Sequence, residues 1–257
     1  MAAGQARIAH AQNPGRRVVI LDRFGHRRWE TIWEGLDYIV RPRQVTVRPI
    51  EIRNGPGLRP YIAGKTAERW TWREWPGGQG SPIGEIRFNQ DEDDFGLHYG
   101  GRIVLEPHIK AKASPNKGWG WIRWNKLAWL LQTKHGQRVA QLGPIGTPLL
   151  EGAEHIVTNG FRRAAAVLKH ARAAVLPEGG LHHAAAAVGT SAVVIRGGFI
   201  GPAATGYAGQ IDFFDGDGLG CGMRIPCDHC RDAMAAIRPE EVAETLMEIL
   251  MRQKECA

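Results

Sequence analysis

The chain has 257 residues, of which 43% are hydrophobic and 23% charged; this composition is typical of a soluble globular protein and excludes a disordered one. No apolar run is long enough to span a membrane, and residues 1–17 lack the apolar core of a secretory signal, so we expect a cytoplasmic protein without a transmembrane segment. The four cysteines are too few for a disulfide scaffold, which agrees with a reducing compartment.

The net charge of +7 is spread unevenly along the chain. Residues 1–75 hold 14 Lys or Arg against 7 Asp or Glu, and residues 111–140 hold 6 basic residues and no acid. Residues 141–257 are mildly acidic, with 10 basic residues against 13 acids. A basic segment without acids attracts phosphate groups of nucleotides, nucleic acid or lipid headgroups, and a solvated basic face is the alternative.

The first hundred residues predict few regular elements. Residues 17–21 (RVVIL) are typical of a strand, and residues 29–38 are compatible with a helix. The chain then becomes rich in Pro, Gly, Trp and Arg without a clear period, and the acidic run 91–95 is interpreted as a solvated loop, with metal binding as the alternative. We therefore expect a reduced, irregular N-terminal lobe over residues 1–99.

The rest of the chain alternates short apolar strands with helical patterns. The expected strands are 102–106, 138–142, 173–176, 191–196 and 211–214. The expected helices are 121–135, a helix capped by Thr158 or Asn159 that runs to 171, 181–188, and a last one that begins at Pro239. This alternation predicts an α/β fold with right-handed βαβ units around a parallel, Rossmann-type sheet in a C-terminal lobe, residues 100–257.

Ligands of open parallel sheets bind beyond the carboxyl ends of the strands, where three loops of this chain lie. The stretch Pro177-Glu-Gly-Gly180 leads into an alanine-rich helix, and Gly179 and Gly180 would let a ligand approach the backbone. The helix N-terminus would receive a diphosphate, His182 or His183 could donate to it, and Glu178 could bind a ribose. The alternative is a tight turn followed by surface histidines.

The other two loops add further candidates. Lys117 precedes Trp119 in a glycine-containing turn at the start of a helix, where its mobile charge suits a phosphate. Gly143 begins the loop 143–148 and is a further candidate for donor binding.

Five segments together resemble the C-terminal lobe of glycosyltransferase family 9, the heptosyltransferases of lipopolysaccharide synthesis, which have a GT-B fold. The segments are KGWGWIRWNKLAWLLQ, VAQLGP, LPEGGLHHAAAAVGTSAVVIRGG, CDHCRDAM and IRPEEV. The family has a Lys before a Trp at a helix start, and an Asp-Thr-Gly-Leu-x-His hinge before an alanine-rich helix. Glu178 stands at the position of the Asp, Gly179 at the Thr and His183 at the His. The resemblance covers roughly residues 100–245.

This resemblance implies an inverting, metal-independent glycosyltransferase that uses a nucleotide-diphospho-sugar donor and no cofactor. It implies that Lys117 binds phosphate, that Gly179, Gly180 and His183 hold the diphosphate, and that Glu178 binds the nucleoside or the sugar. Cations and helix amides would stabilise the departing diphosphate.

The N-terminal lobe departs from the family's pattern. The family has a Gly-Asp after the first strand, and that Asp is the expected base. In this chain the corresponding sequence is VVILDRFGHRRW, in which Gly25 is followed by His26. His26 is therefore the expected catalytic base, with Asp22 as the other candidate. The expected acceptor is a saccharide, a lipid-linked molecule reached by peripheral membrane contact, or modified DNA. The alternative is a non-catalytic protein that binds nucleotide sugars or nucleic acid with a degenerate glycosyltransferase fold.

Cys221, Cys227 and Cys230, with His229 beside them, form the remaining cluster. We expect reduced cysteines in a loop and no metal, and a structural zinc site is the alternative. We expect no catalytic role for this cluster, and Cys256 is expected to be merely terminal.

Overall fold

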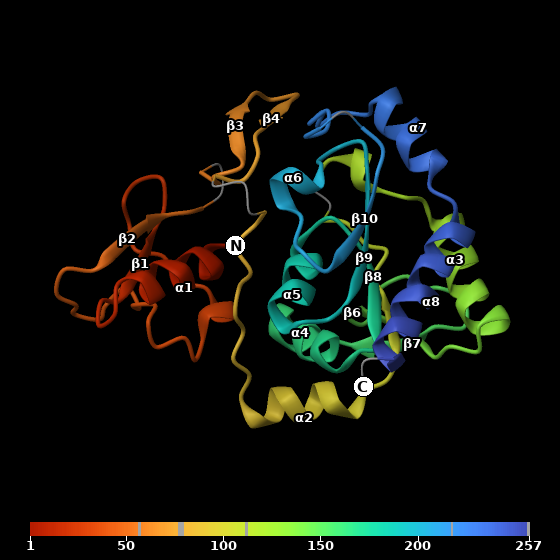
Figure 1. The fold of residues 1–257 in the computed structure, drawn as a ribbon, viewed down its shortest axis with the longest axis horizontal. Helices are drawn as coiled ribbons and strands as arrows, with labels where there is room; N and C mark the ends of the chain where they lie inside the picture. Colours follow the sequence, from red (N-terminus) through yellow and green to blue (C-terminus); the bar gives the residue numbers. More distant parts are fainter. Residues whose placement is uncertain (56–57, 77–79, 111–112, 217, 256–257) are drawn as a thin grey trace.

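The computed structural model describes residues 1–55, 58–76, 80–110, 113–216 and 218–255. It shows a larger C-terminal lobe built on one sheet and a smaller N-terminal lobe beside it (Figure 1). Cys256, expected to be merely terminal, lies outside the described residues.

A six-stranded parallel sheet is the centre of the C-terminal lobe, in the order β10-β9-β8-β5-β6-β7. Every neighbouring pair is parallel, and Ile103 is aligned with both Val139 and Ala173. The strands are β5 (Ile103–Leu105), β6 (Val139–Gly143), β7 (Glu154–Val157), β8 (Ala173–Pro177), β9 (Ala192–Gly197) and β10 (Gln210–Phe214). The predicted α/β fold with a parallel sheet is confirmed.

Alternate residues of each strand point to opposite faces, so the two faces of the sheet have separate cores. Ile103 and Leu105 pack on one face with helices α3 (Trp121–Trp129) and α8 (Pro239–Glu255). Val104 packs on the other face with α4 (Phe161–His170) and α5 (Gly180–Val188). The strands are buried on both faces, which explains their nearly continuous apolar sequences.

The N-terminal lobe has a small core of its own. Helix α1 (Ala2–Gln12) packs on β1 (Val18–Leu21), which pairs in parallel with β2 (Ile50–Arg53). The chain between these strands contains only the short 3-10 turn η1 (Thr31–Trp33), and the Trp33 side chain is buried in this core. The lobe is therefore irregular, as the sequence predicts.

Two elements that precede residue 100 pack against the C-terminal lobe. The antiparallel hairpin β3 (Ile62–Lys65) and β4 (Trp70–Trp72) contributes Trp72, whose indole N–H donates to the carbonyl of Phe199 at 2.8 Å. Helix α2 (Gln90–His98) lies along α4. The boundary between the lobes at residue 99 stays a prediction.

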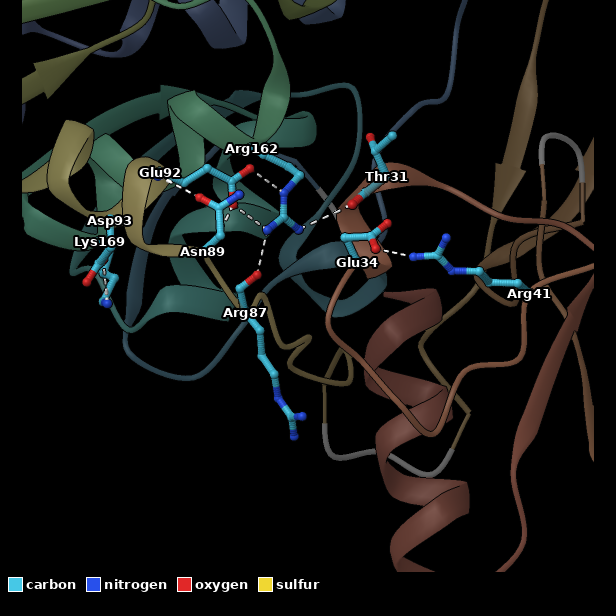
Figure 2. Close-up of polar contacts among 9 residues, drawn as sticks. All are labelled: Thr31, Glu34, Arg41, Arg87, Asn89, Glu92, Asp93, Arg162 and Lys169. Carbon is cyan, nitrogen blue, oxygen red and sulfur yellow. Dashed lines mark hydrogen bonds and ion pairs between the residues drawn. The ribbon is translucent and has the colours of Figure 1, made fainter. Parts of the chain in front are cut away.

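Arg162 of α4 joins three segments (Figure 2). Its guanidinium donates to both carboxylate oxygens of Glu92 on α2, each at 2.6 Å, and to the carbonyl of Thr31 at 3.2 Å. It also donates to the carbonyl of Arg87 in the chain that links the lobes. One side chain thus ties the N-terminal lobe, the linking chain and α2 to the sheet.

Three local predictions are wrong. Residues 29–38 do not form a helix, because only η1 is helical and Gly35 then adopts a left-handed φ of 80°. The acidic run 91–95 is not a loop: Asn89 and Glu92 form a capping box, and the acids occupy the positive first turn of α2. Helix α4 begins after Gly160 without a side-chain cap from Thr158 or Asn159.

The predicted helix over residues 121–135 is confirmed, although its end from Leu130 to Lys134 widens into a π-helical turn. The cysteine segment contributes a helix that the sequence did not predict, α7 (Asp228–Ala236), in which Cys230 is buried. Across the part of the chain that the structure describes, no helix combines the length and apolar character needed to cross a bilayer.

Candidate functional site

Lys117 and Glu178 meet at the carboxyl edge of the sheet. Lys117 ends the 3-10 turn η2 (Pro115–Lys117), which begins after the cap Ser114, and Glu178 follows β8 directly. The Lys117 ammonium forms an ion pair with the Glu178 carboxylate and lies 3.4 Å from its carbonyl oxygen. The structure therefore brings together two residues that are 61 positions apart in the sequence.

Glu178 is ionised although it is buried. Burial raises its pKa, but the charges of Lys117, His182 and Arg196 and the Lys117 hydrogen bond outweigh this and lower it to about 2. Only 18% of the Lys117 side chain and 6% of the Glu178 side chain are exposed. A phosphate that binds Lys117 must therefore share its charge with Glu178.

His182 forms hydrogen bonds within the protein through both of its ring nitrogens. Its ring is fully buried; Nδ1 accepts the backbone N–H of Gly179 at 2.9 Å, and Nε2 lies 3.0 Å from the carbonyl of Thr205. These contacts fix the neutral tautomer with the proton on Nε2. Burial lowers the pKa of His182 to about 4, and the charge of Arg196 acts in the same direction. Both ring nitrogens form hydrogen bonds within the protein. His182 therefore positions residues 177–180, called the hinge below, and does not face solvent.

His183 differs from the exposed histidine that the alternative interpretation of the hinge expects. Its Nδ1 lies 2.9 Å from the hydroxyl of Tyr207, the residue is half-buried, and burial holds its pKa well below the ordinary value. Arg196 of β9 is fully buried, pairs with Asp212 and donates to the hydroxyl of Thr205 at 2.7 Å, and the carbonyl of the same Thr205 contacts His182. The hinge thus rests on a buried polar layer.

Gly179 and Gly180 have different surroundings. Gly179 is extended, with φ 168°, and a Cβ there would meet nothing closer than the Pro177 carbonyl at 3.9 Å. A Cβ on Gly180 would lie 3.0 Å from the ring of Phe161. The space above Gly180, which the sequence predicts to receive a ligand, is therefore partly filled by Phe161.

A cavity of about 820 Å³ opens at the same edge of the sheet. It contains Gly143, one of the predicted donor residues, and Phe161. The other lining residues are Glu106, His108, Leu142, Pro144, Thr147, Pro148, Thr158, Asn159, Gly160, Ala164 and Leu181. Lys117 and Glu178 do not line this cavity, but Leu181 belongs to the first turn of α5, directly after the hinge.

Glu106 and His108 form a pair in the wall of this cavity. The Nδ1 atom of His108 lies 2.7 Å from a carboxylate oxygen of Glu106, which also accepts the His108 backbone N–H at 3.0 Å. Among the described residues, the buried Nε2 of His108 has no hydrogen-bond partner. With Nδ1–H donating to Glu106, Nε2 keeps a lone pair that can accept a further hydrogen bond.

The expected bases His26 and Asp22 lie together on the loop after β1. The side chain of His26 is 79% exposed, and its Nδ1 lies 3.7 Å from a carboxylate oxygen of Asp22. Asp22 accepts the backbone N–H groups of Phe24 and His26 at 2.8 and 2.9 Å. Within the described residues, neither side chain forms a hydrogen bond or ion pair with Lys117 or Glu178. The structure thus places both candidates in the N-terminal lobe, apart from the hinge.

Sequence reasoning missed Arg59 and His108. Arg59 donates to the hydroxyl of Tyr61 at 2.7 Å, and although burial lowers its pKa, Tyr61 and the charge of Glu178 raise it overall. Its charge therefore acts on the hinge from the N-terminal side. Arg59 lies in an aperiodic, proline-rich stretch that carries no local signal. For His108, the signal is the spacing Glu-x-His directly after a strand.

The cysteine cluster is compact. The Sγ atoms of Cys221, Cys227 and Cys230 and a ring nitrogen of His229 all lie within 4.8 Å of one another. The Sγ atoms of Cys221 and Cys230 are 2.9 Å apart, and Cys230 Sγ lies 3.9 Å from His229 Nδ1. The three cysteines are free thiols. These four side chains lie close enough together to hold one metal ion.

Comparison with solved structures shows the GT-B-like fold of glycosyltransferases. The chain resembles the E. coli ADP-heptose LPS heptosyltransferase II, with TM-score 0.51 and 17% identity over 66% of this chain and 54% of that one. It resembles a family 9 glycosyltransferase from Veillonella parvula DSM 2008, with TM-score 0.51 and 15% identity over 67% and 55% of the two chains. No protein-family model and no curated protein sequence matches the chain.

A third structure covers nearly the whole chain. The iron-containing dodecameric glycosyltransferase TibC from enterotoxigenic E. coli H10407 matches 98% of this chain and 73% of its own, with TM-score 0.59 and 15% identity. This chain spans about half the length of the first two structures. At these identities the comparisons show the fold, and the predicted resemblance to heptosyltransferases is confirmed at that level.

Proposed function

We propose that this protein transfers a sugar from a nucleotide-diphospho-sugar to an acceptor. The observation that carries the proposal is the cavity at the carboxyl ends of β5 and β6, next to the N-terminus of α5. Its mostly apolar wall, with a few polar groups, suits a nucleoside, and such a site is where parallel sheets of this kind bind nucleotides. Names of the structural neighbours include ADP-heptose, so an ADP-sugar is the first donor to test.

In this proposal the nucleoside occupies the cavity, and the Nε2 atom of His108 accepts a hydrogen bond from its base or ribose. The diphosphate then extends past Leu181 to the first-turn amides of α5 and to Lys117. Free amides and the positive end of the helix dipole favour an anion at this place. Arg59 adds a second cation from the N-terminal side, where its charge already reaches Glu178.

The transfer needs a base for the acceptor hydroxyl and charge stabilisation for the leaving group. His26 is the proposed base, because its imidazole is exposed beside Asp22, which can hold the proton-bearing nitrogen. The departing nucleoside diphosphate gains negative charge, and Lys117, Arg59 and the α5 amides stabilise it. Inversion at the anomeric carbon follows from direct displacement by the activated hydroxyl. A saccharide acceptor fits this chemistry.

Calorimetric titration with an ADP-sugar, a UDP-sugar and free ADP tests the donor site. We expect binding of at least one nucleotide sugar, and we expect His108→Gln to weaken it by about tenfold, the effect of one lost hydrogen bond. His135→Gln is the matched control, because His135 also has a buried Nε2 without a described partner but does not line the cavity. Equal affinity of both variants would show that the cavity does not hold the nucleoside.

Turnover assays separate an enzyme from a binding protein. With the donor bound, His26→Ala should lower kcat at least a hundredfold, the range of general-base catalysis, and leave the donor Kd unchanged. If the protein binds the donor but neither transfers the sugar nor slowly hydrolyses it, a non-catalytic protein is favoured instead.

A further inference from the structure

The cysteine cluster lies outside the proposed donor site, and its contacts reach two other parts of the molecule. We propose that Cys221, Cys227, Cys230 and His229 bind one thiolate-preferring metal ion, zinc or iron, and that this ion fastens hairpin β3–β4 and the Lys117 turn to the sheet. The proposal rests on the four side chains, on the room made for the imidazole, and on the hydrogen bonds of the loop that they would hold.

The donor atoms suit a tetrahedral site. At metal–sulfur bonds of about 2.3 Å, the sulfurs of a tetrahedron lie roughly 3.8 Å apart. All four donor atoms lie within 4.8 Å of one another, so a metal needs only small side-chain rotations. The Sγ atoms of Cys221 and Cys230, 2.9 Å apart, are too distant for a disulfide and must separate slightly around an ion.

Gly198 leaves the space that the His229 imidazole occupies. A Cβ on Gly198 would lie 2.5 Å from Cε1 and 2.8 Å from Nδ1 of His229, so any other residue there would displace the ring. Cys227 caps the N-terminus of α7, a position that favours a thiolate. The backbone N–H of Met223 points at Cys221 Sγ from 3.5 Å, as the backbone donors around metal-bound thiolates do.

The loop between these ligands holds the hairpin. Trp70 of β4 donates its backbone N–H to the Gly222 carbonyl at 2.9 Å, and the Arg69 side chain donates to the Cys221 carbonyl at 2.9 Å. The Arg224 backbone N–H donates to the Glu68 carbonyl at 2.7 Å. Residues 221–224 thus continue the hairpin edge, and a metal that fixes this loop fixes the hairpin.

The same loop holds the turn that carries Lys117. The Asn116 amide donates to the carbonyls of Met223 and Ile225, both at 2.7 Å, and its oxygen accepts the Cys227 backbone N–H at 3.1 Å. Ser114 donates to the Met223 carbonyl at 2.8 Å. The buried Asn116, which directly precedes Lys117, therefore connects the Lys117 turn to the proposed ligand loop. The metal acts on Lys117 through this asparagine.

Metal analysis of protein purified without chelator tests the first half of the proposal. We expect about one zinc or iron per chain, with elemental analysis telling the two apart, and a tetrahedral cobalt-thiolate absorption spectrum after exchange with Co²⁺. Cys227→Ser and Cys230→Ser should lower the metal content, and Cys256→Ser is the control that should not. Gly198→Ala keeps all thiols but crowds His229, so it should weaken the metal about tenfold to a hundredfold.

Hydrogen exchange tests the second half without any donor or activity. After chelation, peptides covering 61–73 and 113–118 should exchange faster, and peptides of β5 and β6 should not change. Wild-type protein that holds no metal and takes up no Co²⁺, or that shows a Cys221–Cys230 disulfide under non-reducing conditions, overturns the metal site. Metal removal that leaves exchange in both segments unchanged overturns its fastening role. None of these outcomes depends on the proposed transferase activity.

Discussion

Lys117 can serve two tasks, neutralising Glu178 and binding a phosphate, and a pair of substitutions separates them. Lys117→Met leaves the buried Glu178 charge without its partner, which costs ~3–5 kcal/mol of unfolding free energy. Adding Glu178→Gln removes that charge and should restore most of the stability. We expect the double variant to bind an ADP-sugar about tenfold to a hundredfold more weakly than the wild type. Denaturant unfolding and calorimetry measure the two effects.

Lys126→Met is the control for these variants, because Lys126 lies in the same basic segment but over the ring of Trp129, with its ammonium 4.5 Å from the ring centroid. It should change neither stability nor donor affinity appreciably. If the Lys117→Met/Glu178→Gln protein binds the donor as tightly as the wild type, Lys117 only neutralises Glu178.

His182 makes the stability of the protein depend on pH. Its pKa is about 4 in the folded protein and 6.5 ordinarily, so between these values the unfolded chain binds more protons than the folded one. The unfolding free energy therefore falls as the pH falls through this window, by about 3 kcal/mol in all. The lowered pKa values of His183 and, below about pH 4.5, Glu178 act in the same direction.

Urea unfolding at pH 7 and pH 4.5 measures this dependence. His182→Gln can still accept from Gly179 and donate to Thr205 but cannot titrate, so its pH slope should be clearly smaller than that of the wild type, with the part due to His183 remaining. An unchanged slope would mean that His182 is not buried as a neutral ring.

At the scale of elements, replacing either of the two glycines at the start of helix α5 should change donor affinity to a different extent. Gly180→Val places carbon against the Phe161 ring, and Phe161 lines the cavity, so we expect the ring to move and the donor to bind at least tenfold more weakly. Gly179→Ala meets open space in an extended backbone and should leave affinity within about twofold. Melting temperature and donor titration together show whether binding changes by more than folding explains.

Gly189→Ala separates stability from binding at the other end of α5. Gly189 ends the helix with a left-handed φ of 79°, where a side chain costs ~1 kcal/mol of stability. Donor affinity should not change. A loss of affinity as large as that of Gly180→Val would indicate that the whole helix, not the Phe161 wall, responds to both changes.

The sequence predicted the sheet because its strands are short, buried on both faces and separated by helices. Strand β7 escaped notice because its residues, EHIV, are mostly polar or half-exposed at the sheet edge. Strand β2 follows a long aperiodic stretch, and its partner β1 lies some thirty residues earlier. Local patterns of this kind cannot predict pairing across an irregular chain.

The same limit applies to the site. Lys117 and Glu178 could be predicted to meet, because each follows a strand of one parallel sheet. The burial of His182 could not be predicted, since its surroundings come from Thr205 and Arg196, which lie on other elements. The contribution of Arg59 depends on how the two lobes pack, which no pattern within one segment reveals.

At the scale of the whole molecule, the proposed transfer requires the His26 loop and the donor site to keep a defined relation. Arg162 is placed to maintain it, because its contacts run from α4 to Glu92, to the linking chain at Arg87 and to Thr31 of the N-terminal lobe (Figure 2). The Arg162 hydrogen bond holds the pKa of Glu92 below its usual range, although burial opposes this. The contact is therefore electrostatic as well as geometric.

Arg162→Ala should lower the unfolding free energy by ~3 kcal/mol, because it leaves the largely buried Glu92 carboxylate without its partner. Its specific consequence should be kinetic. At temperatures where the variant is folded, kcat should fall because His26 is no longer held in position relative to the donor. The donor Kd should stay unchanged because the donor cavity keeps its residues. Arg163→Ala is the matched control, since Arg163 stacks on Phe95 at 4.8 Å and makes no described contact with the N-terminal lobe. Hydrogen exchange over residues 29–34 should rise in the first variant alone. Equal kcat in both variants would show that the lobes keep their relation without Arg162, and equal loss of kcat and donor affinity would reduce its role to general stability.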